Sequence, residues 1–221
     1  MRRCAALARG RRAGPRLCHG GRAGQGAASR QRARHRHRGG LTGGGVPLIL
    51  TFGLDSHTFG RVEAARQRWF PPARNFIPAH LTMFQQLPEA HLSDILATLA
   101  QAAGETPRLP FRVGGLTDYG TGVAYALTMP GFTWRHRTLR DGWRFALGRQ
   151  DRRDRTPHIT VQNKAGYAAT RRCLAALDRD FAPWEGMADR FLLWHYRGGP
   201  WERIAAIPLS ATDMPVTGGP T

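Results

Sequence analysis

One pattern of elements occurs twice between residues 47 and 210, and it limits the folds open to this chain. Each copy has a short histidine-bearing strand, then a helix, then two strands; the copies run from His80 to Met129 and from His158 to Leu209. Identity between the halves is slight, so the repeat is one of pattern. Two α+β lobes, each an antiparallel sheet with helices outside, would bring equivalent strands to a common groove. We therefore expect a bilobal, duplicated α+β fold with two antiparallel sheets facing a central cleft.

Hydrophobic periodicity predicts where the individual elements lie. Leu48–Leu54 is typical of a buried strand, and Asp55-Ser56 can cap a helix that Pro71-Pro72 ends. The other expected strands are 80–84, 111–116, 123–129, 158–161, 187–196 and 201–209, and the other expected helices are 89–103, 134–147 and 167–181. A flexible C-terminus is expected over 211–221.

The basic residues are concentrated before this patterned region. The chain has a formal net charge of +18, but residues 1–46 hold twelve arginines and no acidic residue. The rest carries 21 basic and 15 acidic residues, a net charge of +6, so charge alone is weak evidence for a nucleic-acid partner. Residues 1–46 contain almost no large apolar side chains, which predicts a disordered Arg/Gly-rich tail.

Three interpretations of this tail are open. It could hold RNA electrostatically, or it could be an organelle-targeting peptide, because transit sequences are rich in arginine and poor in acidic residues. It could also be absent from the native protein if translation starts at Val46, which the abrupt strand onset at Pro47 favours. A secretory signal is not indicated, because the tail has no apolar stretch of roughly 7–15 residues.

Cysteine content and hydropathy limit the compartment and the cofactors. Cys4, Cys18 and Cys173 are too few and too scattered for a disulfide framework or a zinc finger, and they favour a reducing, cytoplasmic setting. No apolar run approaches the roughly 20 residues of a membrane-spanning helix. We expect the chain to fold without a metal or cofactor, because 41% of its residues are hydrophobic. We also expect a monomer.

Two short segments carry the candidate chemistry: His80-Leu81-Thr82-Met83 and His158-Ile159-Thr160-Val161. Side chains alternate along a strand, so the histidine and threonine of each segment share one face about 6–7 Å apart, while the apolar residues point into the core. Each segment therefore offers one proton-transfer group and one hydroxyl to the cleft. Two histidines without a catalytic role are the alternative, which the repeated motif in equivalent halves disfavours.

In these motifs the chain resembles the 2H phosphoesterase superfamily, in particular the bacterial 2′-5′ RNA ligase-like proteins. That family has two His-h-Thr-h motifs, where h is apolar, in a bilobal α+β fold, and the resemblance here spans residues 47 to about 210. It implies that His80, Thr82, His158 and Thr160 are catalytic without a metal. It also implies a substrate that is an RNA end or a nucleotide with a 2′-5′ or 2′,3′-cyclic phosphate linkage.

The residue types suit that chemistry. Histidine, with a reference pKa of about 6.5, can take a proton from attacking water or give one to the leaving oxygen at neutral pH. Threonine hydroxyls can donate hydrogen bonds to the non-bridging oxygens. Run backwards, the same site could join a 5′-hydroxyl to a cyclic phosphate. The sequence does not decide which histidine is the acid.

Further candidates are weaker. Tyr125 could stack on a base, whereas Arg155 and Lys164, which flank the second motif, could contact a phosphate. The aromatic segment Trp194–Trp201 could form a nucleotide platform. A core tyrosine, solvated charges and a packed turn explain these residues equally well. The remaining histidines of the patterned region have no spacing that indicates a metal site; they are His57, His91, His136 and His195.

Two other functions compete with a phosphoesterase for RNA ends. One is a cyclic phosphodiesterase for a small metabolite, and the other is a non-catalytic RNA-binding module. The intact histidine pairs argue against the binding module, because binding alone does not require two positioned acid/base groups.

Overall fold

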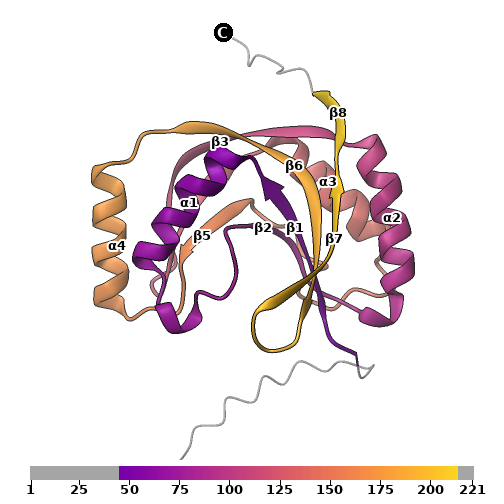
Figure 1. The fold of residues 1–221 in the computed structure, drawn as a ribbon, viewed down its shortest axis with the longest axis horizontal. Coiled ribbons are helices and arrows are strands. Elements are labelled where there is room, and N and C mark those ends of the chain that lie inside the picture. Colours follow the sequence, from indigo (N-terminus) through magenta and orange to yellow (C-terminus); the bar gives the residue numbers. More distant parts are fainter. Residues whose placement is uncertain (1–44, 214–221) are drawn as a thin grey trace, which may run out of the picture. The chain divides into compact units, whose positions relative to one another are not determined.

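The computed structural model describes residues 45–213, which belong to one compact unit (Figure 1). Its helices are α1 (Ser56–Trp69), α2 (Leu92–Glu105), α3 (Pro130–Gly142) and α4 (Tyr167–Arg179), with 3-10 turns η1 (Pro72–Arg74) and η2 (Glu89–His91). Its strands are β1 (Leu48–Leu54), β2 (Leu81–Leu87), β3 (Pro107–Asp118), β4 (Val123–Thr128), β5 (His158–Gln162), β6 (Trp184–Tyr196), β7 (Trp201–Pro208) and β8 (Ser210–Asp213). Residues 1–44 of the predicted tail and residues 214–221 lie outside the described part.

Local signals explain the first two elements. All seven residues of β1 are buried, as a continuous apolar run predicts for a central strand. Asp55 then caps α1: its Oδ1 accepts the Thr58 N–H at 2.8 Å, and its Oδ2 accepts the Met187 N–H at 2.7 Å. The predicted cap is confirmed, and the same carboxylate also ties α1 to β6.

The strands form one sheet in the order β7-β6-β1-β2-β5-β4-β3-β8, and β3 also pairs with β6. Strand pairing therefore runs from β1 to β2, β5, β4, β3 and β6 and back to β1, so these six strands form a closed ring. The predicted α+β class is confirmed, but two separate sheets are not observed, because the long strands β3 and β6 run continuously through the structure. β2 and β5 pair only at Leu81 and Ile159. The pairing between these two strands, where the histidine motifs meet, is therefore very short.

The predicted repeat is confirmed, but the strands of its two copies are interleaved. β2-α2-β3-β4 and β5-α4-β6-β7 follow the same order along the chain. In the sheet, β4 of the first copy lies beside β5 of the second, whereas β6 and β7 of the second lie on the side of β2. β4 of the first half therefore lies next to the second motif, whereas β1 separates β6 from the first motif.

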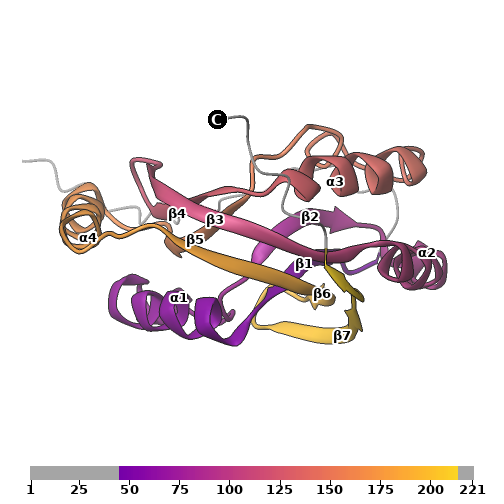
Figure 2. The same ribbon diagram turned by 90° about the horizontal axis from the view of Figure 1, so that it is seen from above.

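The helices cover the strands from different sides. Figure 2 shows α1 and α3 on opposite sides of the strands, and α4 and α2 at opposite ends. The core between these layers is apolar and includes the rings of Phe52, Phe132 and Phe191; the Phe52 and Phe191 rings are stacked at 5.1 Å between centroids. The motif residues Leu81 and Ile159 belong to the same cluster and are fully buried.

Several predicted boundaries are wrong, among them the starts of β3 (Pro107, expected at 111) and β6 (Trp184, expected at 187) and the end of α3 (Gly142, expected at 147). The helix expected from Trp134 begins at Pro130, because proline fits the first turn of a helix, where its missing N–H costs no hydrogen bond. The flexible C-terminus expected over 211–221 is wrong for residues 211–213, because Ser210–Asp213 forms β8 parallel to β3, with the Ser210 N–H donating to the Thr106 carbonyl at 2.8 Å.

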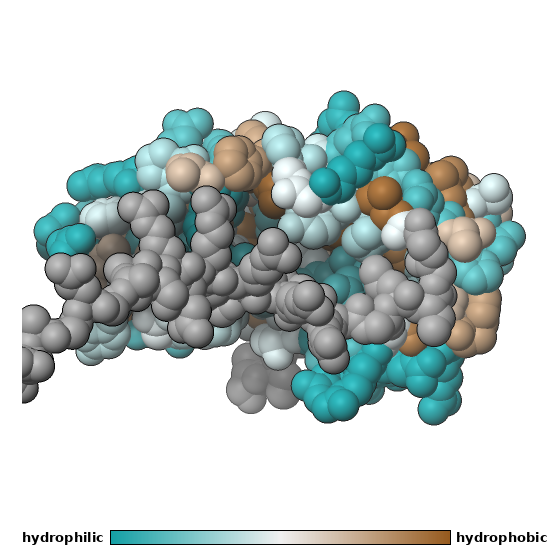
Figure 3. Space-filling model, turned by 90° about the horizontal axis from the view of Figure 1, so that it is seen from below, coloured by the Kyte–Doolittle hydropathy of each residue, from teal (hydrophilic) through white to brown (hydrophobic). Residues whose placement is uncertain are grey.

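The surface of the described part is mixed. On the face drawn in Figure 3, hydrophilic residues dominate and apolar residues occur in separate groups. Several large apolar side chains are nevertheless exposed, among them Phe145 at 72% and Tyr167 at 73%. Isolated exposures of this kind are normal for a folded protein, so they do not by themselves define a binding surface.

Candidate active site

The candidate site forms where β2 and β5 meet. These strands are antiparallel, and Leu81 pairs with Ile159. In such a ladder the residue before one partner lies opposite the residue after the other, so His80 lies beside Thr160 and Thr82 beside His158. All four side chains are partly exposed, on the face opposite to the buried Leu81 and Ile159. The structure thus brings the two predicted pairs together.

Both imidazoles are held in the same way. His80 Nδ1 lies 2.7 Å from the Pro78 carbonyl oxygen, and His158 Nδ1 lies 3.0 Å from the Thr156 carbonyl oxygen. A carbonyl oxygen can only accept a hydrogen bond, so Nδ1 carries the proton in each ring. Each histidine is therefore left with Nε2 for exchanging a proton with a substrate.

The surroundings of His80 lower the pKa of its imidazole. Burial lowers its pKa to about 4; the hydrogen bond to Pro78 opposes this shift, and the charges of Arg66 and His158 add to it. The Trp201 ring lies against the imidazole, with 4.8 Å between ring centroids. At neutral pH, His80 is consequently an uncharged imidazole, which is the form that can act as a base.

An aromatic ring accompanies each histidine. Tyr119, in the turn between β3 and β4, packs against His158 with 5.8 Å between centroids, and Trp201, at the start of β7, packs against His80. Because the halves are interleaved, the first sequence half supplies the ring beside His158 and the second supplies the ring beside His80. The predicted aromatic segment Trp194–Trp201 therefore does reach the site, whereas Tyr119 escaped the sequence analysis because it lies far from either motif along the chain.

The strands beside the motifs present small side chains. Ala124 pairs with Thr160 and Ala126 with His158 on the β4 side. On the β1 side, Thr51 pairs with Thr82, and the Trp194 indole N–H donates to Thr51 Oγ at 3.0 Å. Ala124 is fully buried, whereas Ala126 is partly exposed beside His158.

The two motif threonines keep their hydroxyls free. Within residues 45–213, neither Thr82 nor Thr160 uses its hydroxyl in a hydrogen bond to another protein group. By contrast, the buried Thr106 donates its hydroxyl to the Ala102 carbonyl oxygen. Partly exposed hydroxyls beside two imidazoles are suited to donate to phosphate oxygens.

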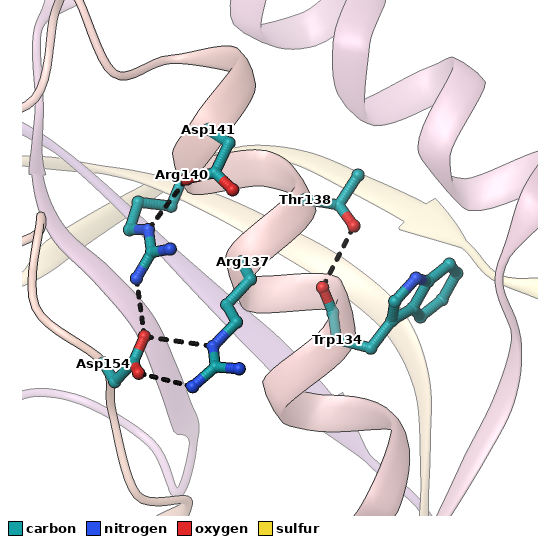
Figure 4. Close-up of polar contacts among 6 residues, drawn as sticks. All are labelled: Trp134, Arg137, Thr138, Arg140, Asp141 and Asp154. Atoms are coloured by element: carbon teal, nitrogen blue, oxygen red, sulfur yellow. Dashed lines mark hydrogen bonds and ion pairs between the residues drawn. The ribbon is translucent and has the colours of Figure 1, made fainter.

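The loop before His158 is fixed at two points. The Asp151 carboxylate is buried and accepts the N–H groups of Gln85 (3.0 and 3.1 Å) and Gln86 (2.7 Å) on β2. Further along, Asp154 accepts hydrogen bonds from Arg137 and Arg140 of α3, as Figure 4 shows. The loop that leads to the second motif is thus attached both to α3 and to the strand of the first motif.

Arg66 is a site residue that the sequence did not reveal. It lies on α1, is 2% exposed, and donates from its Nη1 to the Thr160 carbonyl at 2.8 Å. Its Nη2 donates to Asn75 Oδ1 at 2.8 Å and to the Ile77 carbonyl at 2.7 Å. In an arginine-rich chain with no unusual spacing around this residue, nothing in the sequence distinguished it.

Tyr125 does not face the site, contrary to the prediction. It pairs with Ile159 on the core side of the sheet, is 5% exposed, and packs edge-on against Trp184 at 4.9 Å. It also lines a pocket of about 180 Å³ on the side of α1 and α4, away from the histidines. β4 is apolar on both faces, so the sequence could not show which of its residues face the motifs.

Arg155 and Lys164, predicted to contact a phosphate, have the following neighbours. Arg155 is half-buried beside Asp151, with Nη2 and Oδ1 3.6 Å apart, so its charge has a partner within the loop. Lys164 is exposed in the turn after β5, with a positive φ of 54°, and its N–H donates to Asn163 Oδ1 at 2.8 Å. A phosphate contact by either residue therefore stays a prediction.

The remaining histidines have other neighbours. His195 Nε2 lies 3.0 Å from Glu89 Oε1, His91 packs against Phe145, and His136 is buried between aromatic rings. Over residues 45–213, no three His, Cys, Asp or Glu side chains gather as they would around a metal ion. None of the helices in this range is long and apolar enough to cross a membrane.

The two His/Thr pairs thus lie together on one face of β2 and β5. The model of the 2′-5′ RNA ligase superfamily matches residues 54–200, and the chain belongs to this family. No curated protein matches the chain.

Solved structures show the same fold. The protein TT0787 of Thermus thermophilus is 20% identical with a TM-score of 0.53; the match covers 74% of this chain and 97% of that one. Escherichia coli LigT in its apo form is 20% identical with a TM-score of 0.51, covering 75% and 98%. LigT complexed with 3′-AMP is 21% identical with a TM-score of 0.51, covering 74% and 98%.

Proposed function

We propose that this protein is a metal-independent phosphodiesterase that acts on 2′,3′-cyclic phosphate or 2′-5′ linkages of RNA ends or nucleotides. The observation that carries the proposal is the interleaved cluster of His80, Thr82, His158 and Thr160, in which both imidazoles are oriented through Nδ1. Membership of the 2′-5′ RNA ligase superfamily supports it. The buried free thiol of Cys173 is compatible with a reducing compartment such as the cytoplasm.

Hydrolysis of a cyclic phosphate needs two proton transfers. One imidazole takes a proton from water as the water oxygen bonds to phosphorus, and the other gives a proton to the ribose oxygen as its bond to phosphorus breaks. The hydroxyls of Thr82 and Thr160 donate to the non-bridging oxygens, where charge increases in the transition state. A 5′-hydroxyl in place of water opens the same ring. One imidazole takes the proton of the 5′-hydroxyl as its oxygen bonds to phosphorus, the other gives a proton to the ribose 3′-oxygen as its bond to phosphorus breaks, and a 2′-5′ linkage forms.

The aromatic rings favour a nucleotide substrate. Trp201 and Tyr119 stand beside His80 and His158, and a ring next to each acid/base group can stack on a base attached to the reacting phosphate. The structure of LigT complexed with 3′-AMP shows a nucleotide bound to a protein of the same fold.

The test is turnover of a short RNA ending in a 2′,3′-cyclic phosphate by the full-length chain in EDTA. The comparison is the His80→Ala/His158→Ala double variant, and the control is His57→Ala, on the exposed face of α1. We expect equal turnover by the parent and the control and none by the double variant. A strict requirement for added divalent metal would contradict the mechanism.

The same assay separates the competing functions. RNA that is bound but not turned over would indicate a binding module. Neither binding nor turnover of RNA, together with hydrolysis of a small cyclic phosphodiester such as ADP-ribose cyclic phosphate, would indicate a metabolite enzyme.

A further inference from the structure

Arg66 connects parts of the chain that meet at the site. Its three hydrogen bonds reach the Thr160 carbonyl in the second motif, the Ile77 carbonyl before the first motif, and the Asn75 side chain at the end of η1. Neighbouring Glu63 on the same helix accepts the Ala79 N–H at 2.8 Å. One turn of α1 therefore holds the backbone on both sides of the candidate site.

Only an arginine can make this set of contacts. The guanidinium is a rigid planar fork with five donors, so Nη1 and Nη2 can bond groups on different segments at the same time. A lysine in this position would keep the charge but present a single nitrogen. The buried carbonyls of Thr160 and Ile77 would then share one donor group or lose a partner.

The charge of Arg66 also acts on His80. Burial is the main reason that the pKa of His80 is low, and Arg66 and His158 lower it further. The charged or titratable groups around His80 are Arg66 and Glu63 from α1 and His158 from β5, while β7 contributes the neutral Trp201. Glu63 Oε2 lies 3.8 Å from Arg66 Nε and offsets part of its charge.

We propose that Arg66 is a positioning residue of this site: its hydrogen bonds to the Thr160 and Ile77 carbonyls and to the Asn75 side chain set the spacing of the two motifs. This assignment rests on the proposed phosphodiesterase function. The hydrogen bonds to the motif segments and the electrostatic effect on His80 come from the same guanidinium. Substitutions of Arg66 can separate these two effects.

The experiment compares Arg66→Gln, Arg66→Lys and the control Arg68→Gln in the full-length chain. Arg68 is exposed on the same helix and stands over Trp69, so its removal takes away one positive charge without touching the motifs. Two quantities are measured: the NMR titration of the His80 ring, assigned by its absence in His80→Gln, and the pH dependence of kcat/KM on an RNA 2′,3′-cyclic phosphate.

We expect Arg66→Gln to raise the pKa of His80, to move the acidic limb of kcat/KM to higher pH, and to lower kcat on the order of tenfold or more. Arg66→Lys should lower kcat while the His80 titration stays close to that of the parent, because the charge is kept and the fork is lost. Arg68→Gln should change neither quantity.

An unchanged His80 titration in folded Arg66→Gln overturns the electrostatic part, and full kcat in Arg66→Lys overturns the positioning part. If Arg66→Gln does not fold, Arg66→Lys decides the proposal by its kcat and its His80 titration. The ring titration needs no turnover. An inactive parent protein would therefore refute the phosphodiesterase function, while the effect of Arg66 on His80 would still be measured.

Discussion

The buried imidazole of His136 gives a quantitative prediction about acid stability. It is 1% exposed and lies between the rings of Phe84 and Phe132, with centroid distances of 4.7 and 5.8 Å. Burial lowers its pKa to about 4, and the nearby positive charges of Arg155 and Arg140 contribute in the same direction. Asp154 and a hydrogen bond to the Met83 backbone oppose the shift.

The magnitude follows from the two pKa values. In the unfolded chain the ring titrates at about 6.5, so on acidification the unfolded state takes up the proton first. The stabilising contribution is fully present above pH 6.5 and is lost as the pH falls toward 4. Between pH 7 and pH 5 the free energy of unfolding should fall by about 2 kcal/mol through His136 alone, with a limit of about 3 kcal/mol at lower pH.

The assay is urea unfolding at pH 7 and pH 5 of the parent, of His136→Phe and of a control. Phenylalanine keeps an aromatic ring between Phe84 and Phe132 but cannot be protonated. The loss of unfolding free energy between the two pH values should be smaller in His136→Phe by about 2 kcal/mol. His57→Phe removes an exposed imidazole from α1 and serves as the control. Equal losses in the parent and His136→Phe would refute the reasoning.

Three other changes test the site and its support. Thr82→Val or Thr160→Val should slow turnover on the order of a hundredfold with little change in the urea midpoint; unfolding would show a structural role instead. Trp201→Ala should raise KM for a nucleoside 2′,3′-cyclic phosphate about tenfold or more, and an unchanged KM would exclude stacking on this ring. Asp55→Ala should lower the unfolding free energy by about 2 kcal/mol at pH 7. Although burial opposes it, hydrogen bonds to Thr58 and Met187 lower the Asp55 pKa, so the difference should shrink as the pH falls through that lowered value.

Local rules predicted much of the fold. The apolar run of β1, the Asp55 cap and the order of elements in both copies were visible in the sequence and are confirmed. Helix ends were less certain, as Pro130 shows, because a proline can either interrupt a helix or begin one. β8 was missed because its formation depends on a partner strand about a hundred residues away.

The aromatic residues show which features local sequence patterns could not predict. Tyr125 and Trp201 were both candidates for stacking, yet only Trp201 lies beside a histidine. The face that a strand residue occupies depends on pairing register, and a register shift by one residue would exchange the faces. Tyr119 reaches His158 only because the β3–β4 turn of one half lies beside the motif of the other.

The sequence by itself determined the candidate site of this protein: two strands, each carrying a histidine and a threonine on one face with apolar residues on the other. This information is local, because the alternation of side chains needs only the strand backbone. The tertiary structure alone decided that His80 lies beside Thr160, that Arg66 joins the segments around both motifs, and that a buried environment keeps His80 uncharged. These features depend on pairing and burial between residues up to 94 positions apart, which no local pattern encodes.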